Sequence, residues 1–137
     1  MRFLQSVLTL IILFTTVPAA LSAESCDKPN SSQADLNECY SNTYKHSDTQ
    51  LNALYRQITA RLKDDAQTTK LLVTAQKAWV AFRDAECNFS TSGSADGSVY
   101  PMMQSICLNG LTASRIEDLK SYLKCEEGDM SCPVPAQ

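Results

Sequence analysis

The stretch TTKLLVTAQKAWVAFRDAEC, residues 68–87, determines the fold predicted for this 137-residue chain. It contains neither Pro nor Gly, and its apolar residues recur three and four positions apart, which is the spacing of a helix face. We therefore predict a helix from Thr68 to Cys87. Its core face should consist of Leu71, Leu72, Ala75, Trp79 and Phe82. Small residues on a neighbouring face would allow close approach of another element: Ala78, Ala81 and Ala85.

A second helix is predicted upstream, over residues 33–63, where neither Pro nor Gly occurs. Ser31 or Ser32 is a suitable N-cap for it. Weak helix formers at 46–48 make that segment the place where the helix could bend. The short polar junction at 64–67 predicts that the two helices form an antiparallel hairpin. The apolar face of the upstream helix should contain Leu51, Leu54, Tyr55, Ile58 and Leu62.

Downstream, residues 88–100 are small and polar and predict a surface loop. Pro101 can open a third helix, predicted over Met102–Lys124, in which Gly110 is an unfavourable residue. The tail, residues 125–137, should be irregular. The chain is thus predicted to be all-α, an up-down-up three-helix bundle stapled by disulfides.

The beginning of the chain has the pattern of a secretory signal peptide. Arg2 supplies a positive charge, residues 7–14 are apolar, and residues 18–23 include small residues suited to cleavage. The apolar run is shorter than the roughly 20 residues of a membrane span. We predict a leader at 1–23 and one helical domain at 24–137, periplasmic or secreted, with no stable membrane anchor after cleavage.

Six cysteines follow the leader, and an even number in a short exported chain predicts three disulfides. No Cys-x-x-Cys pair occurs, which disfavours a metal site. In an up-down-up bundle, Cys125 and Cys132 lie at one end and should pair with each other. The other four lie at the opposite end, where local pairing gives Cys26–Cys39 and Cys87–Cys107, although crossed pairings remain open.

Composition and motifs argue against several functions. Removal of the leader leaves 11 Lys and Arg against 15 Asp and Glu, and an acidic surface does not suit nucleic acid. The single histidine, His46, has no arrangement of nucleophile and base around it, and no glycine-rich phosphate loop occurs. We therefore predict no catalytic residue, no cofactor and no metal, and a protein partner.

Two groups of residues are candidates for a functional site. Polar side chains occur within the helical stripes, and we predict that they fix the register of the helices, with ligand binding as the alternative. The members of this polar cluster are Asp48, Asn52, Gln76, Trp79, Arg83, Asp84 and Arg115. Asp48 is the expected partner of the Arg83 guanidinium. The second group belongs to the loop and could bind a partner, with a simple connector as the alternative. Its members are Ser90, Thr91, Ser92, Ser94, Asp96 and Ser98.

The chain resembles the family named for the N-terminal domain of the lysozyme inhibitor LprI. The matching positions are Cys39, Asp48, Leu51, Asn52, Tyr55, Leu72, Gln76, Trp79, Phe82, Arg83, Asp84, Cys87, Cys107, Thr112, Arg115 and Leu119. The resemblance covers about Cys26 to Lys124, and Cys125 and Cys132 are additions to the pattern. It implies a non-catalytic inhibitor of lysozyme-type glycosidases. The alternatives are an envelope interaction module, such as the immunity partner of a toxin, and, less favoured, an enzyme acting on wall glycan.

Overall fold

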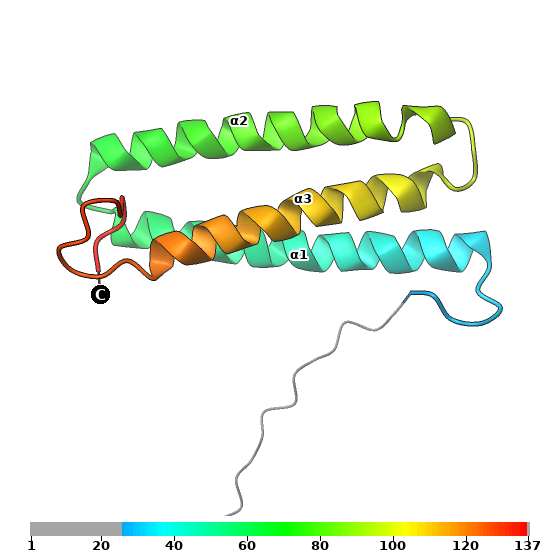
Figure 1. Ribbon diagram of the computed structural model, residues 1–137, viewed down its shortest axis with the longest axis horizontal. Helices are drawn as coiled ribbons and strands as arrows, with labels where there is room; N and C mark the ends of the chain where they lie inside the picture. The colour runs from blue at the N-terminus through cyan, green and yellow to red at the C-terminus, as the bar shows by residue number, and fades with distance from the viewer. Residues whose placement is uncertain (1–25, 137) are drawn as a thin grey trace, which may run out of the picture.

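The computed structural model describes residues 26–136, so the predicted leader at 1–23 lies outside the described part of the chain. Three long helices make up the domain: α1 (Gln33–Arg61), α2 (Ala66–Ser90) and α3 (Tyr100–Leu123). A short 3-10 helix, η1 (Ser92–Ser94), follows α2. The long helices alternate in direction (Figure 1). The predicted all-α fold is therefore confirmed.

The helix boundaries follow from their capping residues. Ser32 and Asp35 form a capping box at the start of α1, in which each side chain binds the backbone N–H of the other residue. Asp65 caps α2 through the backbone N–H of Thr68. α1 continues without a break through residues 46–48. α2 continues to Ser90, three residues beyond the predicted end.

These caps predict a loss of stability in acid. Hydrogen bonds from Ser32 lower the pKa of Asp35, and hydrogen bonds from the side chain and backbone of Thr68 lower the pKa of Asp65. The unfolded chain then binds more protons, so stability is present above about pH 4 and falls as the pH drops through the lowered values. Thermal unfolding followed by circular dichroism at pH 7 and pH 3 measures this loss.

The control for this prediction is the double variant Asp35→Asn/Asp65→Asn. Asn accepts the same capping hydrogen bonds but does not titrate. Its midpoint of thermal unfolding should therefore depend less on pH than that of the parent. An equal pH dependence in both proteins would assign the acid sensitivity to other groups.

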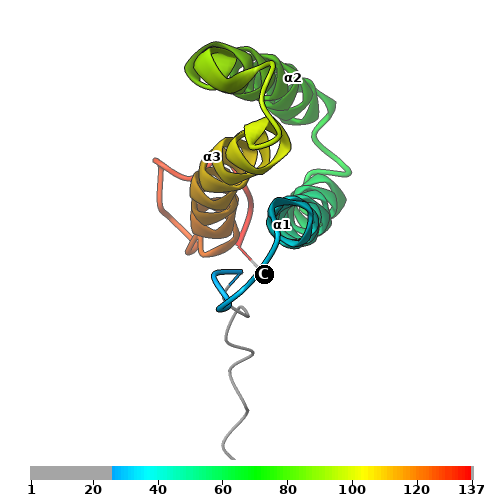
Figure 2. The same ribbon diagram turned by 90° about the vertical axis from the view of Figure 1, so that its right-hand side faces the viewer.

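The bundle is arranged around α3, which lies between α1 and α2 (Figure 2). α1 and α3 run in the same direction and pack along their length, as two hydrogen bonds show. The Ser47 hydroxyl lies 2.6 Å from Oδ1 of Asn109, and the Arg61 guanidinium donates to the carbonyl of Leu123 at 3.0 Å. The first two helices run antiparallel across a short connection, as predicted, but α3 lies between them and their backbones barely approach each other (Figure 1 and Figure 2).

The hydrophobic core lies at the end of the bundle where α1 and α3 terminate. Ile58 of α1 and Leu62, which directly follows α1, pack with Leu119 of α3, and all three side chains are buried. The irregular tail completes this core, because Val134 is 3 % exposed and packs against it. The tail therefore contributes to stability through apolar burial.

α2 presents a different face to the bundle from the one predicted. Leu71 and Phe82 are 64 % and 55 % exposed, and Ala75 is also exposed. The inward face includes Trp79 and Arg83. The prediction of Leu71, Ala75 and Phe82 as core residues is wrong because paired polar side chains take the inward positions, as described below.

The structure joins all six cysteines in local pairs. The pairs are Cys26–Cys39, Cys87–Cys107 and Cys125–Cys132, which excludes crossed pairing among the described residues. The second pair links the end of α2 to α3. Within residues 26–136, no helix is long and apolar enough to cross a lipid bilayer.

One buried hydroxyl predicts a stabilising substitution. Thr112 on α3 is fully buried, and its Oγ1 has no hydrogen-bond partner. Burying an unpaired hydroxyl is unfavourable, so the isosteric change Thr112→Val should raise the free energy of unfolding by about 1 kcal/mol. Urea unfolding measures the change. A decrease in stability would show that the hydroxyl has a partner, such as a buried water.

Candidate functional site

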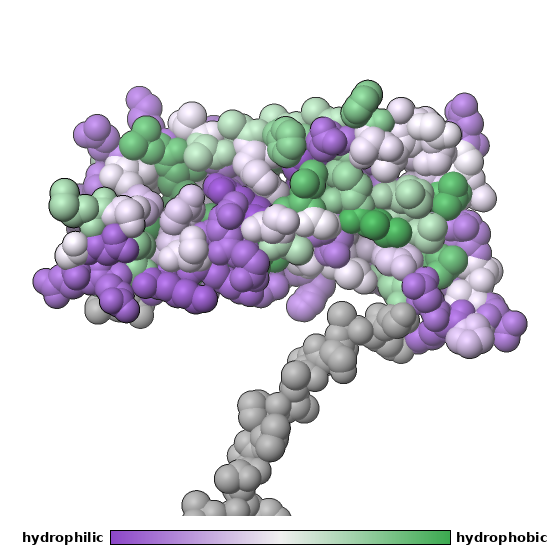
Figure 3. All heavy atoms as spheres, viewed as in Figure 1, coloured by the Kyte–Doolittle hydropathy of each residue, from purple (hydrophilic) through white to green (hydrophobic). Residues whose placement is uncertain are grey.

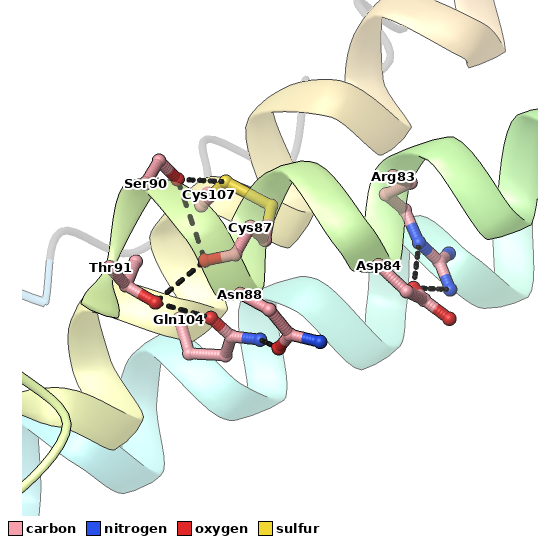
Figure 4. Close-up of a disulfide and its surroundings, with 8 residues drawn as sticks. All are labelled: Arg83, Asp84, Cys87, Asn88, Ser90, Thr91, Gln104 and Cys107. Atoms are coloured by element: carbon pink, nitrogen blue, oxygen red, sulfur yellow. Dashed lines mark hydrogen bonds and ion pairs between the residues drawn. A yellow bond between two sulfur atoms is a disulfide. The ribbon is translucent and has the colours of Figure 1, made fainter.

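The structure brings the predicted polar cluster together from three helices. Its members are Asp48 and Asn52 on α1, Gln76, Trp79, Arg83 and Asp84 on α2, and Arg115 on α3. One end of the cluster lies about one helical turn from the disulfide that ties α2 to α3, as Figure 4 shows for Arg83 and Asp84.

Arg83 is the centre of this cluster. Its side chain is 8 % exposed, and its Nη2 and Nε lie 2.8 Å and 2.9 Å from Oδ1 of Asp84. Its Nη1 lies 3.4 Å from Oδ1 of Asp48, the predicted partner. The guanidinium carbon also lies 5.2 Å from the ring centroid of Trp79 and 5.6 Å from that of Tyr44. A buried guanidinium is thus held by two carboxylates and two aromatic rings.

Tyr44 is a further member of the cluster that the sequence analysis did not identify. Burial raises the pKa of its hydroxyl, and the nearby Arg83 charge partly offsets this effect. The signal that could have identified it is its spacing, because Tyr44 precedes Asp48 by one helical turn and so shares its face.

Arg115 approaches the same tryptophan from α3. Its Nε lies 3.2 Å from Oε1 of Gln76, and its Nη1 lies 3.4 Å from Oδ2 of Asp118. Its guanidinium carbon lies 6.0 Å from the Trp79 ring centroid. Trp79 therefore contacts one cation from its own helix and one from α3, and Gln76 ties α2 directly to α3.

This geometry favours a structural role for the cluster. Each guanidinium already has partners within the domain, and Arg83 is too buried to reach another molecule. Each polar contact between helices forms only at one rotation of α2 about its axis and one position along it. Together these contacts would fix the register of α2 relative to α1 and α3. That role stays a prediction.

The predicted binding loop is shorter and more ordered than expected. After α2, η1 and successive turns are closed by hydrogen bonds between residues three apart, including Gly97 N–H to Ser94 O and Tyr100 N–H to Gly97 O. Thr91 is buried, and its hydroxyl lies 2.6 Å from the Cys87 carbonyl oxygen. Thr91 therefore anchors the loop to the end of α2. The prediction that Thr91 lies on the surface of the loop is wrong.

A polar network around the disulfide holds the loop on the bundle (Figure 4). The Thr91 hydroxyl also lies 2.7 Å from Oε1 of Gln104 on α3, whose Nε2 donates to Oδ1 of Asn88 at 2.8 Å. Ser90 lies 3.5 Å from the Cys107 sulfur.

The side chains of Ser92, Asp96 and Ser98 are exposed, whereas Ser94 is half-buried and its hydroxyl donates to the Thr91 carbonyl. The outer surface of the loop thus presents hydroxyls and one carboxylate.

Nothing in the described part of the chain resembles a metal centre. Between residues 26 and 136, no group of three His, Cys, Asp or Glu side chains is placed to hold a metal ion. His46 is exposed on α1. The remaining candidate residues are those of the loop at the end of the bundle where α2 ends and α3 begins.

Fold and surface together define a small helical domain, stapled by disulfides, with a rigid polar loop at one end. This chain belongs to the LprI lysozyme inhibitor family, because the family model "Lysozyme inhibitor LprI" matches residues 26–119. The resemblance inferred from the sequence motifs is thereby confirmed, and Cys125 and Cys132 lie outside the matched region. An uncharacterised protein of Rhizobium meliloti (strain 1021) is 30 % identical over 138 residues, covering 93 % of this chain and 99 % of that protein. No solved structure matches the chain.

Proposed function

We propose that this chain is an exported, non-catalytic protein that binds lysozyme-type glycosidases and inhibits them. The observation that carries the proposal is the family match, which extends over α1, α2 and most of α3. The proposal includes cleavage of a leader at 1–23 and a periplasmic or secreted location. Three disulfides suit an oxidising compartment of that kind.

The net charge suits a basic partner such as a lysozyme. Without the leader the chain carries 15 acidic against 11 basic side chains. Lysozymes of the animal type are commonly basic, and opposite net charges accelerate encounter. This attraction predicts that inhibition weakens as the salt concentration rises.

The loop end of the bundle is the surface proposed to bind. The Cys87–Cys107 disulfide and the Thr91 contacts hold it in one conformation, so binding would cost little conformational entropy. Exposed hydroxyls such as those of Ser92 and Ser98 can donate to carboxylates and accept from amides. The glycan-binding cleft of a glycosidase contains carboxylates, to which these hydroxyls could donate, and amides, from which they could accept.

The test is the residual lytic activity of purified lysozymes mixed with equimolar oxidised protein. We expect lysis by at least one lysozyme type to fall in proportion to the protein added. Unchanged lysis across several lysozyme types would refute the proposal, and capture of a different periplasmic partner would then favour an interaction module.

Two glycine substitutions distinguish the loop from the rest of the surface. A Cβ atom at Gly93 in η1 or at Gly110 on α3 would lie in open space, with no non-neighbouring atom within 4 Å, and neither glycine has a positive φ. Gly93→Arg should weaken inhibition at least tenfold by obstructing the loop surface. Gly110→Arg adds the same charge and bulk on α3 and should leave inhibition unchanged. Equal effects of the two changes would place the binding surface elsewhere.

A further inference from the structure

A pocket lies between α2 and α3 at the end of the bundle opposite the loop. The Cys87–Cys107 disulfide joins the two helices near the loop, and from there they diverge toward the start of α2 (Figure 1 and Figure 2). The pocket has a volume of about 200 Å³. Figure 3 shows hydrophobic residues at the surface here, along the first turns of α2. The divergence of α2 thus leaves a cavity that the loop does not reach.

The walls of this cavity, named the α2–α3 pocket here, are predominantly apolar. They include Ile58, Leu62, Leu71, Leu72, Tyr122 and Val134. Three of these residues, Ile58, Leu62 and Val134, belong to the hydrophobic core, whereas Leu71 is 64 % exposed. The pocket therefore extends from the core to the surface, and a pocket of this kind suits a ligand with an apolar body.

Arg115 of α3 brings a positive charge to these apolar walls. Its side chain lines the pocket and is only 11 % exposed. Its Nε contacts Gln76, and its Nη1 lies 3.4 Å from the carboxylate of Asp118, which is itself 59 % exposed. A guanidinium has five N–H donors, so these two contacts leave donors for another acceptor. A cation held among apolar walls favours an anionic ligand group.

Tyr122 supplies a second donor to the same pocket. It follows Arg115 by seven residues, and residues seven apart share one face of a helix. Its hydroxyl has no hydrogen-bond partner within residues 26–136. Of the described residues that line the pocket, only Arg115 is charged, which matches the single negative charge of a carboxylate. A carboxylate can accept hydrogen bonds from a guanidinium and from a hydroxyl.

The volume of the pocket limits the size of the apolar body. An apolar cavity of about 150 Å³ holds benzene, so about 200 Å³ admits a chain of roughly six to eight carbons. We propose that the α2–α3 pocket binds a medium-chain fatty acid, with its chain against the core and its carboxylate on Arg115. The pocket lies away from the loop, so this binding is independent of the proposed inhibition.

Titration of the oxidised protein with octanoate at pH 7, followed by tryptophan fluorescence and by calorimetry, tests the proposal. Trp79 is the only tryptophan, and its ring centroid lies 6.0 Å from the guanidinium carbon of Arg115. We expect saturable binding of one octanoate with a dissociation constant on the order of 0.1 mM. Octanol and octylamine, which lack the negative charge, should bind at least tenfold more weakly. Absence of saturable octanoate binding, or equal affinity for octanol or octylamine, would overturn the proposal.

Substitutions assign the binding to this pocket. Arg115→Met keeps most of the side-chain volume but removes the charge, so octanoate should bind at least tenfold more weakly while octanol binds as before. Unchanged octanol binding also verifies that the pocket is folded. Ala75→Phe adds bulk at an exposed residue that lines the pocket and should weaken binding of both molecules.

The matched control is Ala78→Phe, at an exposed alanine one turn further along α2 that does not line the pocket. It should leave the affinity for octanoate unchanged. Octanoate binding that is insensitive to Arg115→Met, or that falls equally in the two phenylalanine variants, would show that the fatty acid does not occupy this pocket.

Discussion

Replacing Arg83 by Met should lower the free energy of unfolding by about 2–3 kcal/mol. Breaking a buried ion pair by removing one partner costs about 3–5 kcal/mol when the other charge stays buried. Here Asp48 and Asp84 are 39 % and 52 % exposed and can be hydrated, so the expected cost is smaller. Met occupies a similar volume but cannot donate to the carboxylates. Urea unfolding of the oxidised protein measures the difference.

Two further variants locate the origin of this effect. Arg83→Lys keeps the charge but cannot bind both carboxylates in the same plane, so it should recover only part of the loss. In a double-mutant cycle with Asp48→Ala, a non-zero coupling energy would show that the 3.4 Å contact contributes directly. If Arg83→Met is as stable as the parent, the polar cluster does not fix the position of α2.

The double variant Cys87→Ser/Cys107→Ser should lose on the order of 3 kcal/mol of unfolding free energy. The bond joins residues 20 apart, and the chain-entropy model gives about this value for a loop of that length. Replacing both cysteines leaves no free thiol to exchange. Since Cys87 is fully buried at the end of α2, the variant should also expose the loop to faster amide exchange.

The comparison for this variant is Cys125→Ser/Cys132→Ser, which opens a bridge between residues only 7 apart. The entropy model assigns it a smaller loss, and the tail lies far from the loop. Hydrogen exchange at Ser94 and Gly97, whose N–H groups donate to loop carbonyls, should therefore rise in the first variant and remain unchanged in the second. Unchanged exchange in both would mean that the turns, rather than the disulfide, order the loop.

The sequence was sufficient to predict features that depend on local patterns. Helix spacing placed the apolar face of α1 correctly, since Ile58 and Leu62 are core residues. The order of helices along the chain predicted the Cys125–Cys132 pair, whereas the local pairing of the other four cysteines was one of several that the sequence left open. The Arg83–Asp48 contact followed from charge, because a cation within a helical stripe requires a nearby carboxylate.

Features that depend on tertiary packing were predicted less well. α2 has apolar residues on two faces, and periodicity cannot distinguish which of them is buried. Hydropathy favoured Leu71 and Phe82, whereas the face with Arg83 is buried because partners from α1 and α2 compensate its charge. Thr91 was assigned to the loop surface because its hydrogen bond to Gln104, 13 residues away, has no local signature.

The parallel packing of α1 on α3 has a consequence for how the chain acquires its structure. Ser47 and Asn109, and Arg61 and Leu123, are each 62 residues apart in sequence. Such separations raise the contact order, which slows folding relative to bundles built from adjacent hairpins. A nascent chain cannot complete the main interface until α3 has emerged. Fragments that end before Arg115 should therefore fail to fold cooperatively, even though they contain two complete helices.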